Sequence, residues 1–308
     1  MHQKSSINTR PARFPLGAHR DAASDLKRGI EDGELVLHYQ PRVSLFDRKI
    51  IGFEALVRWN HPRHGLLEPG EFIPVAEETS LIVPLGRWVL EAACRQMAAW
   101  HESFPRSPLL TVSVNTSMKQ LMQPGLIPDV RCILAETRLR PECLRLEITE
   151  RSIIASSDVM FTTLRQLSAM NIGLEVDDFG TGYSSCNYLR ELPFNTLKID
   201  TSFVKALGRP SDSSGIISTI LRFAGSLGID VTAEGVEARH QFDRLTDLGC
   251  LHGQGYYFSG PVDPDGAATL IQRETQEPED VDIPRSVGPA AACASFKLIE
   301  FRLPSSHT

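Results

Sequence analysis

The sequence predicts an α/β protein with a (β/α)8 barrel of the TIM type. Short apolar segments alternate with longer segments of helical periodicity, which is typical of repeated βα units around a parallel sheet. Eight such strand segments fall within roughly 240 residues, and this spacing fits one barrel better than a doubly wound sheet. Only the short connection Val43–Lys49 joins the first two segments, so we expect an antiparallel hairpin and an irregular start to the barrel.

The predicted strands are short, rich in aliphatic residues and separated by turn residues or helical segments. They are Leu35–Gln40, Ile50–Arg58, Leu110–Asn115, Leu144–Thr149, Gly173–Asp177, Thr196–Ile199, Asp230–Ala233 and Gly255–Phe258. The helices between them are clearest where apolar residues recur at helical spacing, in Leu85–Trp100, Val159–Met170 and Ile216–Leu227.

Composition restricts the class of protein. Hydrophobic residues make up 42% and charged residues 23%, as in a globular protein with a substantial core. The formal net charge of -6 argues against a nucleic-acid polymer as partner, but a small anionic ligand held through a cation remains open. The start of the chain lacks a signal-peptide core and no apolar run approaches the ~18 residues of a membrane span, so we expect no membrane insertion and a cytoplasmic protein.

The two ends of the chain differ from its middle. Residues 1–23 mix Ser, Arg, Pro, Gly and His with little periodicity and are predicted to form a flexible N-terminal arm. Residues 24–272 carry the periodic segments and are predicted to form the barrel domain. Residues 273–308 are predicted to form a mostly disordered C-terminal tail, in which Phe296–Phe301 could dock as a short strand.

Polar side chains recur where the predicted strands end. The βα loops of a parallel barrel converge on one rim, so residues at successive strand ends are expected to lie close together. The set is Glu54, Asn115, Glu147, Asp177, Asp178, Lys198, Asp200, Glu234 and Gln254, of which Glu54 lies within the second predicted strand and Gln254 immediately precedes the eighth.

The chemistry of this set points to a hard divalent cation. Carboxylates and one amide oxygen, without His or Cys, suit Mg²⁺ or Mn²⁺ rather than zinc or copper. Adjacent Asp177 and Asp178 can serve one site only where the strand breaks, and the following residues 179–182 are predicted to provide that break. Two cations about 3.5–4 Å apart would activate water for attack on a phosphodiester.

Helix capping is the alternative explanation for each single residue. An isolated Asp or Glu at a strand end is more often an N-cap than a ligand, and Asp178 before a glycine-rich turn is especially open to that interpretation. So many polar residues at successive strand ends are harder to explain by capping alone.

These residues resemble the EAL-domain family of bacterial cyclic-di-GMP phosphodiesterases, named for the tripeptide that is Glu54-Ala55-Leu56 here. The resemblance extends over roughly residues 24–272, and only the ordered series of motifs makes it specific. The motifs are YQP at 39–41, EALVRW at 54–59, EFIPVAEETSLIVPLGRWVL at 71–90, SVNTS at 113–117, LEITE at 146–150, DDFGTGYSS at 177–185, LKID at 197–200, AEGVE at 233–237 and QGYYF at 254–258.

The resemblance implies a (β/α)8 barrel whose first strand is antiparallel, and hydrolysis of cyclic-di-GMP to 5′-pGpG. It implies two Mg²⁺ or Mn²⁺ ions per site, with Ca²⁺ as an inhibitor. Lys198 would position the nucleophilic water, and Glu234 would also act as a general base. The first ion would be held by Glu54, Asn115, Glu147 and Asp177, and the second by Asp177, Asp178 and Glu234.

The resemblance also assigns supporting roles. Glu237, Asp200 and Gln254 would orient metal ligands or water. Glu150 would anchor the loop 178–185, which in this family couples metal binding to dimer contacts, so a homodimer is expected. The residues implied to contact the dinucleotide are Gln40, Leu56 and Arg58.

Three functions remain open at this stage. The first is an active cyclic-di-GMP hydrolase. The second is a catalytically weak cyclic-di-GMP receptor or protein-interaction module on the same barrel, although every position of the acidic set keeps a competent ligand here. The third is hydrolysis of another phosphodiester.

Overall fold

The computed structural model describes residues 19–154, 158–180, 188–209 and 212–276, and all structural statements concern these ranges. Nine strands form one sheet. They are β1 (Leu35–Ser44), β2 (Ile50–His61), β3 (Gly65–Leu67), β4 (Thr111–Asn115), β5 (Leu144–Thr149), β6 (Gly173–Phe179), β7 (Thr196–Ile199), β8 (Asp230–Ala233) and β9 (His252–Gln254).

Eight of these strands close into a barrel. Neighbours follow the order β1-β9-β8-β7-β6-β5-β4-β2, and β1 pairs with β2 to complete the ring. β1 is antiparallel to both β2 and β9, whereas the pairs from β2 through β4 to β9 are parallel. The predicted barrel with an antiparallel first strand is therefore confirmed. β3, which was not predicted, extends the sheet beyond β2.

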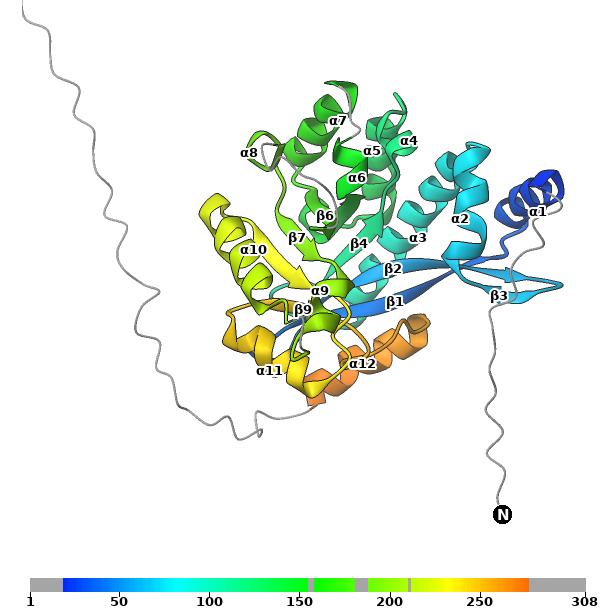
Figure 1. Ribbon diagram of the computed structural model, residues 1–308. Helices are drawn as coiled ribbons and strands as arrows, with labels where there is room; N and C mark the ends of the chain where they lie inside the picture. Colours follow the sequence, from blue (N-terminus) through cyan, green and yellow to red (C-terminus); the bar gives the residue numbers. More distant parts are fainter. Residues whose placement is uncertain (1–18, 155–157, 181–187, 210–211, 277–308) are drawn as a thin grey trace, which may run out of the picture.

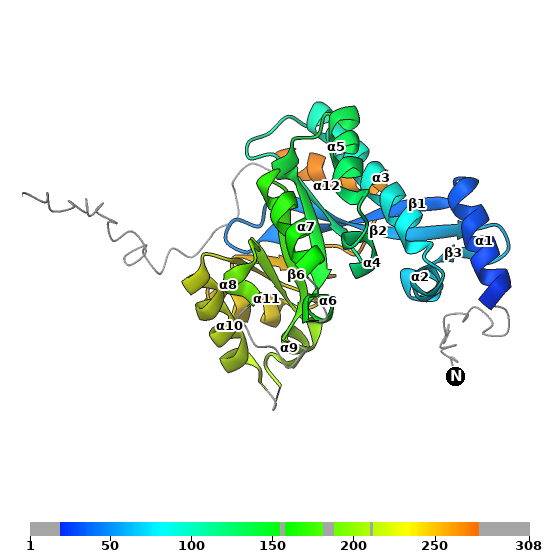
Figure 2. The same cartoon turned by 90° about the horizontal axis from the view of Figure 1, so that it is seen from above.

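Helices surround the barrel and extend it to one side (Figures 1 and 2). None of the described helices is both long enough and apolar enough to cross a bilayer. The helices are α1 (His19–Glu31), α2 (Pro69–Glu78), α3 (Ile82–Ser103), α4 (Met118–Leu121), α5 (Leu126–Thr137), α6 (Glu150–Ile154), α7 (Asp158–Ala169), α8 (Tyr188–Glu191), α9 (Thr201–Ala206), α10 (Ser214–Leu227), α11 (Arg239–Asp247) and α12 (Pro264–Gln276), with a 3₁₀ turn at Pro141–Cys143.

Two apolar clusters stabilise this arrangement. The larger one lies between the barrel and its outer helices, and α3 contributes Val89, Ala93, Met97 and Trp100, which recur on one face of the helix. The smaller one is formed around Trp59, where α1, α2 and the projecting ends of β1 and β2 meet. Figure 1 shows this projection to one side of the barrel.

The last predicted strand was misplaced. Residues 255–258 form a turn, in which the Phe258 amide donates to the Gly255 carbonyl at 3.0 Å, and the strand is β9 just before it. The aromatic residues of this segment favour a strand, but the backbone of Gly255 packs so closely on Val236 that a Cβ would lie 2.2 Å from the Val236 oxygen. Tertiary contacts therefore decide the conformation.

Two helices extend across the predicted domain boundaries. Helix α1 begins at His19, inside the predicted arm, because the apolar face that includes Leu26 packs into the smaller cluster. Helix α12 continues to Gln276, four residues beyond the predicted domain end. The remaining parts of the arm and tail, including Phe296–Phe301, lie outside the described residues.

The interior of the barrel holds a buried ionic network instead of the usual branched aliphatic layers. Both oxygens of the Glu175 carboxylate lie 2.6 Å from Arg42 Nη1, and Oε1 also accepts from Arg145 Nη1 at 3.0 Å. Gly173 makes room for this arrangement, because a Cβ there would lie 2.9 Å from Arg145 Cγ. Burial alone would raise the pKa of Glu175, but the charges of Arg42 and Arg145 lower it to about 2.

We expect Glu175→Gln to lower the free energy of unfolding by about 3–5 kcal/mol, because it leaves the buried Arg42 guanidinium without a compensating charge. Urea denaturation followed by circular dichroism measures the change. The matched control is Glu142→Gln, which removes the exposed partner of Arg140 and should cost less than about 1 kcal/mol. Equal effects of the two substitutions would contradict a structural role for the network.

The same network predicts a pH dependence of stability. The pKa of Glu175 falls from its ordinary 4.5 to about 2 on folding, so its ionised form stabilises the folded state above the unfolded-state pKa. That contribution is lost as the pH falls from about 5 toward 2. The difference in unfolding free energy between the wild type and Glu175→Gln should therefore shrink over this range. A constant difference would rule out the depressed pKa.

Candidate functional site

Lys198 lies at the centre of the polar residues that the sequence predicted at the strand ends. Its Nζ is 2.6 Å from Glu147, 2.7 Å from Glu234, 3.2 Å from Glu54 and 3.4 Å from Asp177. Burial alone would lower the pKa of Lys198, but the surrounding carboxylates outweigh burial and raise it well above its ordinary value. Residues from β2, β5, β6, β7 and the end of β8 are thus gathered around one ammonium group.

Glu54 is fixed by three donors. Its Oε1 accepts from Asn115 Nδ2 at 2.8 Å, and its Oε2 accepts from Gln254 Nε2 at 2.6 Å and from Lys198 at 3.2 Å. Because an ionised carboxylate only accepts, Asn115 has to present its NH₂ group to Glu54. The Asn115 carbonyl oxygen is therefore turned away from Glu54 and is available as a ligand.

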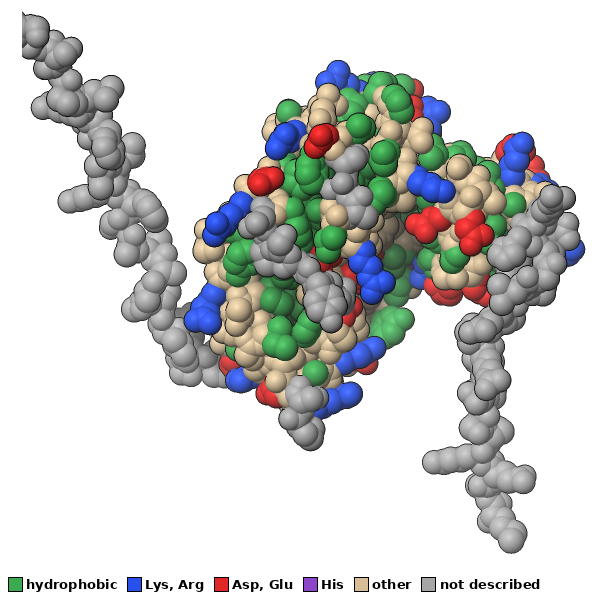
Figure 3. Space-filling model, turned by 45° about the horizontal axis from the view of Figure 1, so that its top comes forward, with side chains coloured by type: hydrophobic (Ala, Val, Ile, Leu, Met, Phe, Trp, Pro, Cys, Tyr) green, Lys and Arg blue, Asp and Glu red, His purple; other side chains and the backbone are tan. Residues whose placement is uncertain are grey.

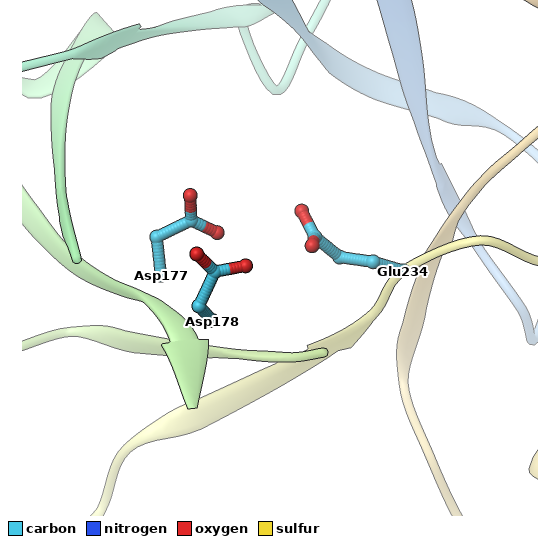
Figure 4. A group of neighbouring side chains, drawn as sticks. All are labelled: Asp177, Asp178 and Glu234. Atoms are coloured by element: carbon cyan, nitrogen blue, oxygen red, sulfur yellow. The ribbon is translucent and has the colours of Figure 1, made fainter. Parts of the chain in front are cut away.

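Asp177, Asp178 and Glu234 form the second group. One oxygen of each carboxylate lies within 4.8 Å of the others, and Figure 4 shows the three side chains directed toward one another. Asp178 has a left-handed backbone with φ of 55°, and the pairing of β6 with β7 shifts register between Val176 and Phe179. A break is therefore present, and it begins within β6 at Asp178, one residue before the predicted segment 179–182. Residues 181 and 182 of that segment lie outside the described residues.

The electrostatics of the two groups reflect crowded negative charge. Burial, with the charge of Glu54, raises the pKa of Glu147 well above its ordinary value. Burial and the charge of Asp177 raise the pKa of Glu234 to about 8, although Lys198 opposes this shift. Burial and Asp177 also raise the pKa of Asp178.

The donor set fits a divalent cation. Among the described residues, Glu147 Oε1 and Gln254 Oε1 are buried without a hydrogen-bond partner. Hard oxygen ligands of this type are those that Mg²⁺ and Mn²⁺ prefer, and a cation would also offset the repulsion between the carboxylates.

Two concave regions adjoin these residues. Figure 3 shows a hollow in the molecular surface, with acidic side chains inside it. A cavity of about 280 Å³ includes Leu56, together with Thr201 and Tyr256, which the sequence did not assign to the site. A cleft of about 460 Å³ shares Leu56 with this cavity, includes Asn115 and Glu147, and reaches α2 and α3. The complete lining of the smaller cavity is Gln40, Glu54, Leu56, Thr201, Glu234, Gly235, Glu237, Gln254, Gly255 and Tyr256.

Other predicted residues have different surroundings. Arg58 lines neither region, and its Nε lies 3.0 Å from Glu68 Oε2. Asp200 caps α9, where its side chain accepts from the Ser202 amide. Capping, the alternative explanation for such residues, thus applies to Asp200.

Glu237 and Glu150 lie at the edges of the site. Glu237 pairs with Lys205 at 3.4 Å and lines the smaller cavity. Glu150 is fully buried and accepts from the Gly180 amide at 3.0 Å, where the predicted loop 178–185 begins. The rest of that loop lies outside the described residues, so the anchoring role stays a prediction.

The family model named EAL domain matches residues 23–261. The chain belongs to the EAL domain family. The resemblance inferred from the sequence motifs is confirmed by this match, which covers the barrel together with α1 and the projection around Trp59.

Curated relatives agree with this assignment. The EAL domain is 44% identical over 238 residues to the bifunctional diguanylate cyclase/cyclic di-GMP phosphodiesterase MucR of Pseudomonas aeruginosa, a match that covers 77% of this chain and 34% of MucR. It is 39% identical over 240 residues to the signaling protein YkoW of Bacillus subtilis, covering 78% of this chain and 30% of YkoW. The match thus spans about a third of the length of these relatives.

Solved structures share the fold. The PaMucR phosphodiesterase in its c-di-GMP complex matches this EAL domain with a TM-score of 0.76 and 43% identity, over 80% of this chain and 99% of that chain. The FimX EAL domain from Pseudomonas aeruginosa bound to c-di-GMP matches with a TM-score of 0.71 and 25% identity, over 79% and 96% of the two chains.

We expect Asp178→Asn to weaken Mn²⁺ binding by about 10-fold or more while the melting temperature of the metal-free protein stays within a few degrees. Asn tolerates the left-handed backbone of residue 178, so the substitution removes a charged ligand without adding backbone strain. Isothermal titration calorimetry with Mn²⁺ measures the affinity. The control is Asp158→Asn at the exposed start of α7, and an unchanged affinity for Asp178→Asn would exclude residue 178 as a ligand.

Proposed function

We propose that this EAL domain hydrolyses cyclic-di-GMP to 5′-pGpG by a two-metal mechanism. The observation that carries the proposal is the convergence of four carboxylates on Lys198, two of which, Asp177 and Glu234, also group with Asp178. The likeness to the PaMucR phosphodiesterase, whose structure holds c-di-GMP, supports the choice of substrate.

The residues available as ligands form two sets that share Asp177. When bound, a pair of Mg²⁺ or Mn²⁺ ions would lower the pKa of water and neutralise charge on the phosphodiester. We propose that Ca²⁺ is inhibitory. The first set is Glu54, Asn115, Glu147 and Asp177, and the second is Asp177, Asp178 and Glu234.

The protein's own groups then have distinct tasks. The Lys198 ammonium, 2.7 Å from Glu234 Oε1, orients the attacking water and offsets charge that develops on the phosphoryl oxygens. Glu234 accepts the proton of that water at a carboxylate oxygen. Gln254 and Glu237 line the same cavity and support these groups, while Asp200 acts indirectly by fixing the start of α9.

The concave regions suit a dinucleotide. Leu56 lines both regions, and the larger cleft also includes the proposed ligands Asn115 and Glu147, so a phosphate near these ligands can lie beside a base in the same cleft. Ile73 and Leu85 give the cleft an apolar lining for a planar base. Arg58 reaches a phosphate oxygen only if it exchanges its ion pair with the exposed Glu68 for that contact.

The proposal also includes the oligomeric state of the protein. Glu150 holds the backbone at Gly180, the last described residue before the loop 181–187. We propose a homodimer in which this loop transmits metal occupancy to the contact between the two copies.

We expect Glu54→Ala to reduce the rate of 5′-pGpG formation by at least roughly three powers of ten, because the substitution removes a proposed carboxylate ligand of the first ion. The purified full chain is incubated with cyclic-di-GMP and Mn²⁺, and products are separated by liquid chromatography. Glu142→Ala, on the surface, is the matched control and should retain wild-type turnover. Chelation with EDTA should stop the wild-type reaction, and added Mn²⁺ should restore it.

The same assay separates the other functions. Retained binding of cyclic-di-GMP by the wild type without any 5′-pGpG would establish a receptor and overturn the proposed hydrolysis. Faster turnover of cyclic-di-AMP or of a simple aryl phosphodiester would overturn the proposed substrate while leaving the metal chemistry in place.

A further inference from the structure

A chain of side-chain hydrogen bonds connects Glu54 with the turn that follows β9. Gln254 Nε2 donates to Glu54 Oε2 at 2.6 Å and to Gln40 Oε1 at 3.0 Å. Gln40 Nε2 in turn donates to the carbonyl oxygen of Ser259 at 3.2 Å. Strands β1 and β2 thus meet the segment 254–259 through two glutamine amides.

The two ends of this chain determine the orientation of both amides. The Glu54 carboxylate and the Ser259 carbonyl are acceptors, so each has to face an NH₂ group. Gln254 therefore presents its NH₂ to Glu54, and the second hydrogen of that group points to the Gln40 oxygen. Gln40 has its own NH₂ on the opposite side, toward Ser259. Neither amide can be rotated by 180° without placing two acceptors in contact.

Backbone pairing supports this geometry. Gln40 lies directly opposite Glu54 in the antiparallel pair of β1 and β2, and Arg42, two residues further along β1, lies opposite Gln254 in β9. Side chains two residues apart on a strand share a face, so Gln40 projects between Glu54 and Gln254. The antiparallel direction of β1 thus brings a glutamine from the first strand beside a carboxylate of the site.

We infer that Gln40 is a positioning residue that acts on Glu54 through Gln254. Its amide oxygen and its NH₂ group each have one protein partner, which fixes the rotation of the amide between Gln254 and Ser259. The contact of Gln40 with the dinucleotide stays a prediction, since Gln40 also lines the smaller cavity. Gln254 is buried, and without Gln40 its NH₂ group loses one of its two acceptors and keeps only Glu54. Glu54 would then sample orientations that do not favour a cation.

The test is a double-mutant cycle with Gln40→Met, Gln254→Met and the combined variant. The kinetic part rests on the proposed function, whereas the Mn²⁺ affinity is measured by calorimetry without substrate. We expect Gln40→Met to weaken Mn²⁺ binding by about 10-fold or more and to lower kcat at saturating Mn²⁺ by a similar factor. We expect KM for cyclic-di-GMP to change by less than about threefold.

The combined variant distinguishes positioning from independent roles. If Gln40 acts through Gln254, adding Gln40→Met to Gln254→Met should change Mn²⁺ affinity by less than about twofold. Gln96→Met on the outer helix α3 is the matched control and should leave both constants unchanged. Gln40→Asn keeps a polar amide but shortens its reach, and it serves as the second variant if Gln40→Met does not fold.

Specific results would overturn the inference. A raised KM with unchanged Mn²⁺ affinity would identify Gln40 as a substrate contact, and fully additive effects of the two substitutions would show that Gln40 does not act through Gln254. If the wild type lacks hydrolase activity, the proposed function fails, but the calorimetric cycle still decides whether Gln40 positions Glu54.

Discussion

The attraction between the Lys198 ammonium and four carboxylates is the interaction on which the site depends. Four negative groups within a few ångströms repel one another strongly in a medium of low dielectric constant, and an unpaired buried charge costs several kcal/mol. Because β7 lies among the parallel strands of the closed barrel, the Lys198 side chain is equally accessible to residues from β2, β5, β6 and β8. Closure of the barrel and charge pairing at its centre are therefore mutually dependent.

The Arg42–Glu175–Arg145 network, in the barrel interior below Lys198, also pairs buried charges of opposite sign. Two guanidinium groups, from Arg42 and Arg145, share the single carboxylate of Glu175, so this layer carries a net positive charge beneath a negatively charged one. The charge of Arg42 also interacts favourably with the carboxylates of Glu147 and Glu54. Polar side chains thus take the place of some apolar packing in the barrel interior, and their positive charges stabilise the acidic groups above them.

The sequence predicted the barrel, and the acidic residues that it placed near strand ends meet around Lys198, because both depend on local periodicity along the strands. It did not predict the Arg42–Glu175–Arg145 network, since alternation along a strand does not reveal which partners meet across the interior. The position of β9 was missed because His252-Gly253-Gln254 has little intrinsic strand preference and pairs only through its neighbours β1 and β8. The left-handed conformation of Asp178 and the capping role of Asp200 likewise depend on the folded backbone.

The reversed direction of β1 also determines how the domain connects to preceding polypeptide. Leu35, where β1 begins, lies opposite Trp59 near the carboxyl end of β2, which is the end of the barrel that carries the acidic residues. Helix α1 therefore leads into the fold from the side of the reaction site, whereas a parallel first strand would start at the opposite end. A domain fused ahead of α1 would therefore join the fold on the projection around Trp59, beyond the carboxyl ends of the parallel strands.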